Sequence, residues 1–440
     1  RITNGRRNRV VSFQSSFLAR LTATGATAHL DFIDAKGKKG VDLGIEAKMT
    51  REGTQLHMTP LNPIIAYRRF TLNEDNYVEL TREGRVLALV DLLADDGTGL
   101  KLYSTPNEDA LQDISLSLNN INMAELTSVM PYAPQLGGLL HGDLHYMQAD
   151  SATTISTDIG IRRMTYEGTP MGDMGLNAIY FPNTDGSHHV DAVVTQNDNE
   201  IAMLAGTYWE QNGEGQIDAE ATLESLPLSL ANAFLPEGTI RLKGATSGSL
   251  TITGRAANPL MTGSLATEGV HVLAEDYSVD LSIPDDTLRV NNSYLDLDRI
   301  EAYAAGKSPL TIDGSINFSD LDNIRLSLDL AAKKYKLIDA PQSHTALAYG
   351  KVYVDMNARA WGTLNDLKVR GRLAVLGNTD VTYVLRDSPI TVQDQLSDIV
   401  TFCDFADTTQ VQTVQRRGQS IDALIVLSAL ITLTCREAAT

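Results

Sequence analysis

Strict alternation of apolar and polar residues is the feature that most constrains how this chain folds. The pattern is clear in residues 113–118 (DISLSL), 323–330 (NIRLSLDL) and 351–356 (KVYVDM). A period of two places successive side chains on opposite faces of a β-strand. Turn signals separate the alternating stretches and favour hairpins over βαβ units; they are Asp95-Asp96-Gly97, Thr184-Asp185-Gly186, Asn212-Gly213, Pro284-Asp285-Asp286 and Asp313-Gly314. We therefore expect an all-β chain of antiparallel strands, each with one apolar and one polar face.

Short helices and an internal repeat interrupt this pattern. Helical spacing predicts short helices at Ala124–Met130, Ser229–Leu235 and Asp394–Phe402, each too short to be stable without packing on the sheet. Residues 118–131 (LNNINMAELTSVMP) align without a gap with residues 223–236 (LESLPLSLANAFLP). A glycine then begins an alternating strand, at Gly142 and at Gly248, and a third such strand begins at Gly350. The recurrence predicts a repetitive architecture in which each unit buries its apolar face against its neighbours.

A sheet with a single apolar face has to cover it, either with a second sheet or by curling around a guest molecule. Aromatic residues make up only 6% of the chain, and the expected inward positions are mainly Leu, Ile, Val, Ala and Met. This lining suits a groove for flexible aliphatic chains as well as a plain core. Composition alone favours the plain core and leaves the groove as the alternative.

Charge and motifs exclude several functions. The formal net charge of −19 argues against a nucleic-acid partner, because such proteins need a basic surface. The sequence has neither a glycine-rich phosphate loop nor a G-x-S-x-G nucleophile motif. His141 and His145 share a strand face with Asp143, and we interpret all three as solvated positions in preference to a zinc site. We predict a protein that is not an enzyme, with no catalytic residue, metal or cofactor.

The C-terminal third carries more specific motifs. Residues 367–387 (LKVRGRLAVLGNTDVTYVLRD) are followed by Ser388-Pro389-Ile390 and by residues 395–405 (QLSDIVTFCDF). The V-R-G-x-L strand, the N-x-x-V-T-Y-V hairpin, the D-S-P turn and the L-x-D-x-V-x-F helix resemble the C-terminal domain of the TamB family. This family of translocation and assembly module proteins belongs to the AsmA-like superfamily, and the resemblance is to its Bacteroidetes form. It extends over roughly residues 50–410.

The resemblance implies an elongated, taco-like β-groove with an apolar interior, which shifts the balance from a plain core to a lipid-binding groove. It implies a non-enzymatic bridge that carries phospholipids between the inner and outer membranes. We expect the acyl chains to contact Leu144, Tyr146, Leu250, Ile252, Val352, Val354, Leu373, Val375, Val381, Tyr383 and Leu385. For each of these residues an ordinary strand core position is the alternative, since a shift of one residue in register inverts the two faces.

The alternative function is an assembly or translocation factor for outer-membrane proteins and autotransporters, which would pair client strands with its own strand edges. In both cases the resemblance implies a partner of the Omp85 type, an outer-membrane barrel assembly protein. It also implies a location in the periplasm of a diderm bacterium, with an inner-membrane anchor upstream of the sequence given. A purely structural β-repeat protein is a third alternative.

The expected organisation follows from these patterns. We predict a linker or truncated start at residues 1–11, groove repeats at 12–150 and 151–256, a TamB-like β domain at 257–412 and an atypical tail at 413–440. We expect the chain to be a fragment, because it starts at Arg1 in a linker-like segment. The tail departs from the terminal strands of the family, and its apolar residues 423–434 (ALIVLSALITLT) predict a buried strand pair or a core helix.

Overall fold

The prediction of an all-β chain with a few short helices is confirmed. The computed structural model describes residues 2–7, 11–22, 24–130, 133–149, 152–235, 240–274, 278–320, 323–341, 348–363, 366–383 and 423–427. Strands account for 75% of the structure and helices for 4%, and the sheet does not close on itself. The predictions of a helix at Asp394–Phe402 and of a lipid contact at Leu385 lie outside the described residues.

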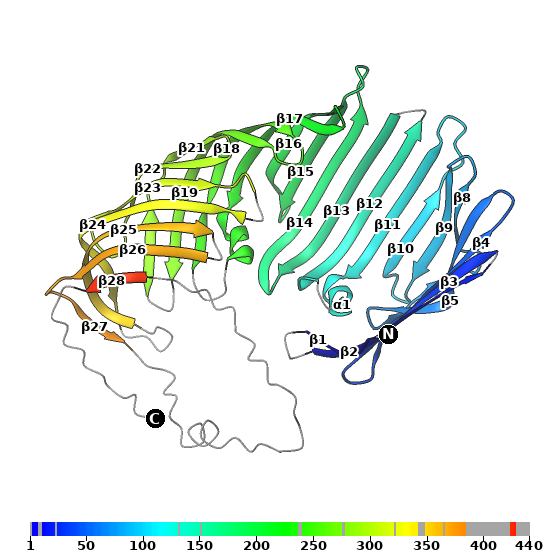
Figure 1. The fold of residues 1–440 in the computed structure, drawn as a ribbon, viewed down its shortest axis with the longest axis horizontal. Helices are drawn as coiled ribbons and strands as arrows, with labels where there is room; N and C mark the ends of the chain where they lie inside the picture. Colours follow the sequence, from blue (N-terminus) through cyan, green and yellow to red (C-terminus); the bar gives the residue numbers. More distant parts are fainter. Residues whose placement is uncertain are drawn as a thin grey trace, which may run out of the picture. The chain divides into compact units, whose positions relative to one another are not determined.

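The chain divides into two compact units. Unit 1 comprises Arg1–Leu226 and Ser249–Pro259, and unit 2 comprises Pro227–Gly248 and Leu260–Thr440. The finer divisions expected from the sequence stay predictions. In unit 1 the strands lie side by side in a single layer, as the cyan and green strands of Figure 1 show.

Long strands and one short α-helix build unit 1. Its elements are β1 (Ile2–Arg7), β2 (Val11–Thr22), β3 (Gly25–Asp34), β4 (Lys39–Met49), β5 (Gly53–Ile65), β6 (Arg68–Arg69), β7 (Thr71–Leu72), β8 (Tyr77–Thr81), β9 (Val86–Leu93), β10 (Gly99–Ser104), β11 (Gln112–Asn122), α1 (Met123–Ser128), β12 (Leu136–Ala149), β13 (Ala152–Tyr166), β14 (Thr169–Pro182), β15 (His188–Gln196), β16 (Asn199–Gln211) and β17 (Glu214–Pro227). From β8 to β17 each strand pairs antiparallel with the next along the chain. The excursion through β6 and β7 leaves β5 paired with β8.

Unit 2 contains the remaining elements, together with part of β18, which both units share. They are a 3₁₀-helix η1 (Leu228–Phe234), β18 (Arg241–Arg255), β19 (Leu260–Ala274), β20 (Val279–Ile283), β21 (Thr287–Asn291), β22 (Tyr294–Ala302), β23 (Leu310–Asn317), β24 (Arg325–Ala340), β25 (Ala348–Thr363), β26 (Asp366–Val375), β27 (Asp380–Tyr383) and β28 (Ala423–Leu427). Pairing is antiparallel except that β28 runs parallel to β26. Residues 423–427 of the predicted tail are therefore a strand that adds to the β26 edge.

Two predicted helices are present where the repeat places them. Helix α1 follows β11, and η1 follows β17. The side chain of Asn122 accepts hydrogen bonds from the backbone N–H groups of Ala124 and Glu125, so it caps the first turn of α1. Among the described residues, no helix combines the length and apolar character that crossing a membrane requires.

The three repeated glycines share one backbone environment. Gly142, Gly248 and Gly350 have φ angles of +136°, +153° and +113°. A Cβ atom on any of them would lie 2.0–2.2 Å from a carbonyl oxygen of the neighbouring strand. Only glycine accommodates this close approach of the neighbouring backbone. This explains why a glycine recurs at these three positions.

One predicted turn is wrong. Asp95–Gly97, Thr184–Gly186 and Asn212–Gly213 connect strands, and Pro284–Asp286 connects β20 to β21. Asp313-Gly314, however, lies inside β23. Gly314 has a φ of +139°, and its Cβ position would lie 2.1 Å from the Ser327 carbonyl oxygen. This glycine permits close strand approach within a strand and does not reverse the chain.

Candidate functional site

The register of unit 1 assigns Leu144 and Tyr146 to a shared face of the sheet. Leu144 lies opposite Leu116 of β11, and Tyr146 lies opposite Ile114. On the other side of β12, Tyr146 lies opposite Ile155 of β13. Directly opposed residues of an antiparallel pair project to the same face. The two predicted contact residues are therefore part of a set that crosses strands.

This set continues from β2 to β17 without a change of face, and we call it the apolar face of unit 1. Its members, read from strand to strand, are Phe17, Ala19 and Leu21; Ala26, Ala28, Leu30 and Phe32; Val41, Leu43, Ile45 and Ala47; Leu56 and Met58; Val78 and Leu80; Val86, Ala88, Val90 and Leu92; Leu100 and Leu102; Ile114, Leu116 and Leu118; Leu144 and Tyr146; Ile155 and Ile159; Leu176, Ala178 and Tyr180; Val190, Ala192 and Val194; Ala202 and Leu204; and Ala219, Ala221 and Leu223.

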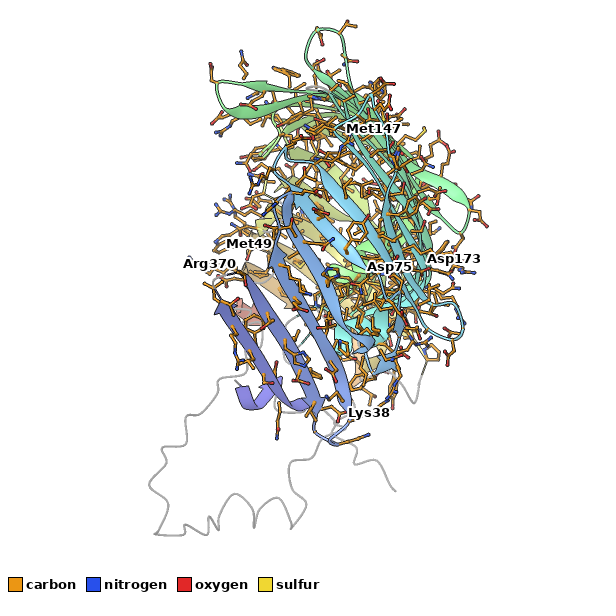
Figure 2. All side chains as sticks on the ribbon, turned by 90° about the vertical axis from the view of Figure 1, so that its right-hand side faces the viewer. Lys38, Met49, Asp75, Met147, Asp173 and Arg370 are labelled. Carbon is orange, nitrogen blue, oxygen red and sulfur yellow. The ribbon has the colours of Figure 1, made fainter. Side chains whose placement is uncertain are left out.

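The opposite face is mostly polar. On β12 it presents Asp143 and His145, and His145 Nε2 lies 3.0 Å from a carboxylate oxygen of Asp113. Hydrogen bonds from Asn107 and His145 hold the pKa of Asp113 below its usual value. A few apolar side chains interrupt this face, among them Leu89, Ile179 and Phe181. Side chains project from both sides of the strands (Figure 2). Because its side chains are mostly polar, we expect the polar face to meet water.

Part of the apolar face is exposed, whereas Val90 and Leu92 are each 3% exposed in a hydrophobic cluster with Phe70 and Leu72. Ile45, Leu80 and Leu176 are 43%, 53% and 40% exposed. A core residue packed between two layers would be nearly inaccessible, and within the described part of unit 1 no second sheet covers these side chains. The exposed stretches of this face indicate a binding surface, and the cluster around Val90 is a core.

At one point the apolar face is capped by the segment around α1. Phe32 and Val41 pack against Tyr67 and against Val129, which follows α1. In the sheet, β3 and β4 are separated from β11 by β5, β8, β9 and β10. Contact across that separation requires the sheet to curve towards its apolar face. Arg68 also reaches Glu125 of α1, with 3.8 Å between Nε and Oε2, at this end of the strands.

Unit 2 brings four predicted residues together in a packed cluster. Val354 is 2% exposed and lies with Tyr335 at the centre, and Val352, Leu373 and Val375 pack against them. The hydroxyl of Tyr335 donates a hydrogen bond to the Ala302 carbonyl oxygen at 3.2 Å. Burial raises the pKa of Tyr335 to about 12. These four predicted residues therefore belong to a local hydrophobic core.

The other predicted residues are placed as follows. Val381 lies opposite Gly350, on the same face as Val352, and it is 37% exposed. Tyr383 is in β27, opposite Ala348. Leu250, which is 8% exposed, and Ile252 lie in the part of β18 that belongs to unit 1. The sequence analysis missed most of the apolar face, including Ile159, Leu176 and Val194, although the alternating pattern was available to find them.

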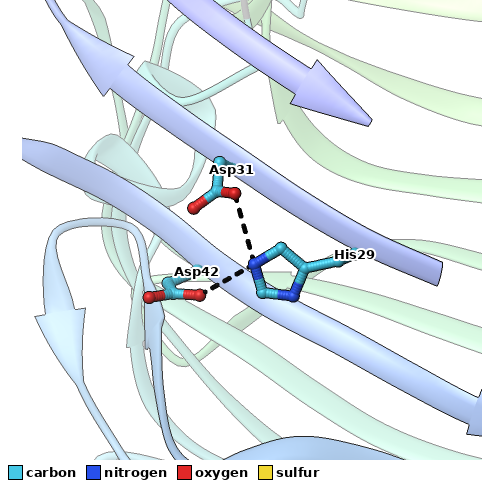
Figure 3. Close-up of side chains that lie close together, drawn as sticks. All are labelled: His29, Asp31 and Asp42. Carbon is cyan, nitrogen blue, oxygen red and sulfur yellow. Dashed lines mark ion pairs between the residues drawn. The ribbon is translucent and has the colours of Figure 1, made fainter. Parts of the chain in front are cut away.

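A polar cluster that the sequence analysis also missed lies on the other face of β3 and β4 (Figure 3). His29 Nε2 lies 3.2 Å from Asp31 and 3.1 Å from Asp42. The spacing of these side chains would suit a metal ion. The ammonium of Lys39, however, lies 2.7 Å from Asp42 and 3.2 Å from Asp31, and these contacts raise the pKa of Lys39. Lys39 therefore already supplies a positive charge between the two carboxylates.

Comparison with known proteins adds no assignment, since no family model, no curated protein and no solved structure matches this chain.

Proposed function

We propose that this chain binds the acyl chains of phospholipids on the apolar face of unit 1 and acts as a non-enzymatic lipid bridge. The observation that carries the proposal is the unbroken register of apolar side chains from β2 to β17, of which Ile45, Leu80 and Leu176 are exposed. At about 4.8 Å between neighbouring strands this face is roughly 60 Å long. One acyl chain spans about half of a bilayer core of about 30 Å, so the face is several lipids long and suits a path more than a pocket.

The energetics favour movement along such a face. Each buried CH₂ group contributes about 0.8 kcal/mol that would be lost on exposure to water. A chain that slides from one strand to the next exchanges one set of Leu, Ile and Val contacts for an equivalent set. The burial therefore stays nearly constant, and no fuel-binding site is needed for diffusion along the path.

The cellular setting is part of the same proposal and follows from the resemblance to the TamB family. In that setting the protein operates in the periplasm of a diderm bacterium, between an inner-membrane anchor and an Omp85-type barrel assembly protein. The lipids then pass between the inner and outer membranes.

Leu176 and Asn177 provide a matched test. They are adjacent on β14, both are exposed, and they project to opposite faces. We expect native mass spectrometry with lipid extraction to find phospholipid on the purified chain. Leu176→Asp should lower the amount of bound lipid, whereas Asn177→Asp adds the same charge on the polar face and should leave it unchanged.

A photo-crosslinking residue gives a direct readout at the same pair. With p-benzoylphenylalanine at position 176 we expect a lipid adduct, and with the same residue at position 177 we expect none. A well-folded, lipid-free protein that gives no adduct at either position would contradict the proposal.

One observation favours the alternative function as an assembly factor. β28 joins β26 in parallel although a long stretch of chain separates them in sequence. The edge of β26 thus accepts an added strand, as β-augmentation by a client would require. In this alternative, outer-membrane protein assembly by the full-length protein should tolerate Leu176→Asp and should fail with Val369→Pro, because proline removes a backbone N–H group from β26 and disturbs its pairing with β28.

A further inference from the structure

The polar face of β24, β25 and β26, opposite the face that carries Leu328, has a cluster of cations in an otherwise acidic protein. The cluster consists of Arg325, Arg359, Lys368, Arg370 and Arg372, all exposed, and we call it the basic patch. Its acidic neighbours are Asp329, with a carboxylate oxygen 4.0 Å from Arg359 Nε, Asp355 on the same face of β25 and Asp366 at the start of β26, and Asp313 of β23 lies opposite Asp329. The patch therefore has a local excess of positive charge in a chain whose net charge is −19.

Without a bound anion, the register of the strands makes the basic patch electrostatically unfavourable. Arg359 of β25 lies directly opposite Arg370 of β26. Like charges in directly opposed positions destabilise a sheet. In the part of the chain that the structure describes, Arg325, Lys368, Arg370 and Arg372 form no ion pair. Arg370 projects away from the strands (Figure 2). A bound anion would offset the repulsion between the two opposed guanidinium groups.

A hollow of about 690 Å³ lies within the patch and reaches the apolar residues of the sheet. It is lined by Arg325, Leu326, Ser327, Arg359, Trp361, Gly362 and Arg370. Leu326 pairs with Gly362, and the next residues on that face, Leu328 and Leu330, continue the apolar side of β24. Arg325 begins β24 and Thr363 ends β25, so the hollow lies at strand ends, where the polar and apolar faces meet.

Trp361 is a residue type that is common at the boundary between lipid and water. Its side chain is 37% exposed, and it lies opposite Lys368 and Ser327. Tryptophan is enriched where one end of the ring is in apolar surroundings and the other is wet. Arginine side chains bind phosphate groups through paired N–H donors.

From this arrangement we infer that the basic patch selects phospholipids whose headgroup carries a net negative charge. The headgroup phosphate binds between Arg359 and Arg370, and the acyl chains extend onto the apolar side of β24 beside Leu326. This inference rests on the proposed function, and it adds a headgroup preference to it. A cation near an anionic lipid contributes about 1 kcal/mol, which corresponds to roughly a fivefold preference for each effective contact.

The test uses the full chain, freed of lipid and then incubated with vesicles of equal parts phosphatidylcholine and phosphatidylglycerol. After re-isolation, the bound lipids are extracted and quantified by mass spectrometry. We expect phosphatidylglycerol to be enriched about fivefold or more. The double variant Arg359→Gln/Arg370→Gln should lose the enrichment while it keeps its total bound lipid. The control Lys101→Gln/Arg289→Gln removes the same charge from exposed positions elsewhere and should keep the enrichment.

The thermal stability of the lipid-free protein provides an independent readout. Since Arg359 and Arg370 repel each other, Arg370→Gln should raise the melting temperature, which also shows that the variant folds. Equal binding of the two lipids by the unchanged protein would overturn the headgroup inference and leave the proposed function standing. A protein that binds neither of the two lipids would overturn the proposed function itself.

Discussion

The strand glycines allow a sharp test of why the repeat contains them. In Gly142→Ala the new Cβ atom would lie 2.0 Å from the Asp158 carbonyl oxygen, at a residue whose φ is +136°. In Gly213→Ala the φ angle is also positive, at +79°, but no atom lies within 4 Å of the new methyl group. The pair separates steric overlap from backbone strain.

The two substitutions should differ severalfold in cost. A positive φ at a residue with a side chain costs on the order of 1–3 kcal/mol. Overlap with a backbone that cannot move away adds about 1–3 kcal/mol. We therefore expect Gly142→Ala to lower the free energy of unfolding by about 3–5 kcal/mol. Gly213→Ala, with the strain alone, should lower it by about 1 kcal/mol.

Differential scanning calorimetry measures this difference. For a unit of this size, each kcal/mol corresponds to roughly 2–4 °C in melting temperature. Gly142→Ala should thus lower the melting temperature of its unit by about 6–20 °C and Gly213→Ala by no more than about 4 °C. Equal shifts would refute the argument, because they would mean that the neighbouring strand moves aside and that close approach is not what requires glycine.

Three further outcomes follow from individual groups. Hydrogen bonds from Arg68 and then Thr98 lower the pKa of Asp96 to about 2. The resulting stability is present above the ordinary pKa and is lost as the pH falls towards 2, so thermal melts of Asp96→Asn and of the unchanged protein should converge over that window. The raised pKa of Tyr335, about 12, stabilises the fold below pH 10. That stability is lost as the pH rises from 10 to 12; ultraviolet titration should find a tyrosine that ionises near pH 12, and this step should be absent in Tyr335→Phe. Val354→Asp places a charge at a position only 2% exposed and should unfold unit 2 in urea at a markedly lower midpoint; a normal midpoint would contradict the packed cluster.

The fold could be predicted from local pattern because the pattern and the structure have the same period. Residues 113–118 and 323–330 alternate strictly, and residues 113–118 of β11 and 325–330 of β24 are strands with alternate residues on opposite faces. The failure at Asp313-Gly314 has a clear cause. An Asp-Gly pair is compatible with a turn and equally with close strand approach, and only the identity of the neighbouring strand decides between them.

The candidate site could be predicted only in part, because exposure depends on what covers a face. Leu144 and Val354 have the same alternating surroundings in sequence. In the structure, Leu144 belongs to the uncovered face of unit 1, whereas Val354 lies in a packed cluster with Tyr335. The cluster forms through contacts between several strands, and a one-dimensional pattern carries no information about such contacts. The basic patch was missed for the same reason, since its cations come from three strands.

The pairing of each strand with its neighbour in sequence has a consequence for how the protein folds. Most contacts from β8 to β17 close short loops, so each hairpin forms at a small entropic cost and without waiting for distant segments. Each new strand then adds to an edge that is already formed, as in other proteins whose units contact only their neighbours. A chain with this order of pairing can fold progressively from its first strands while later strands are still being synthesised.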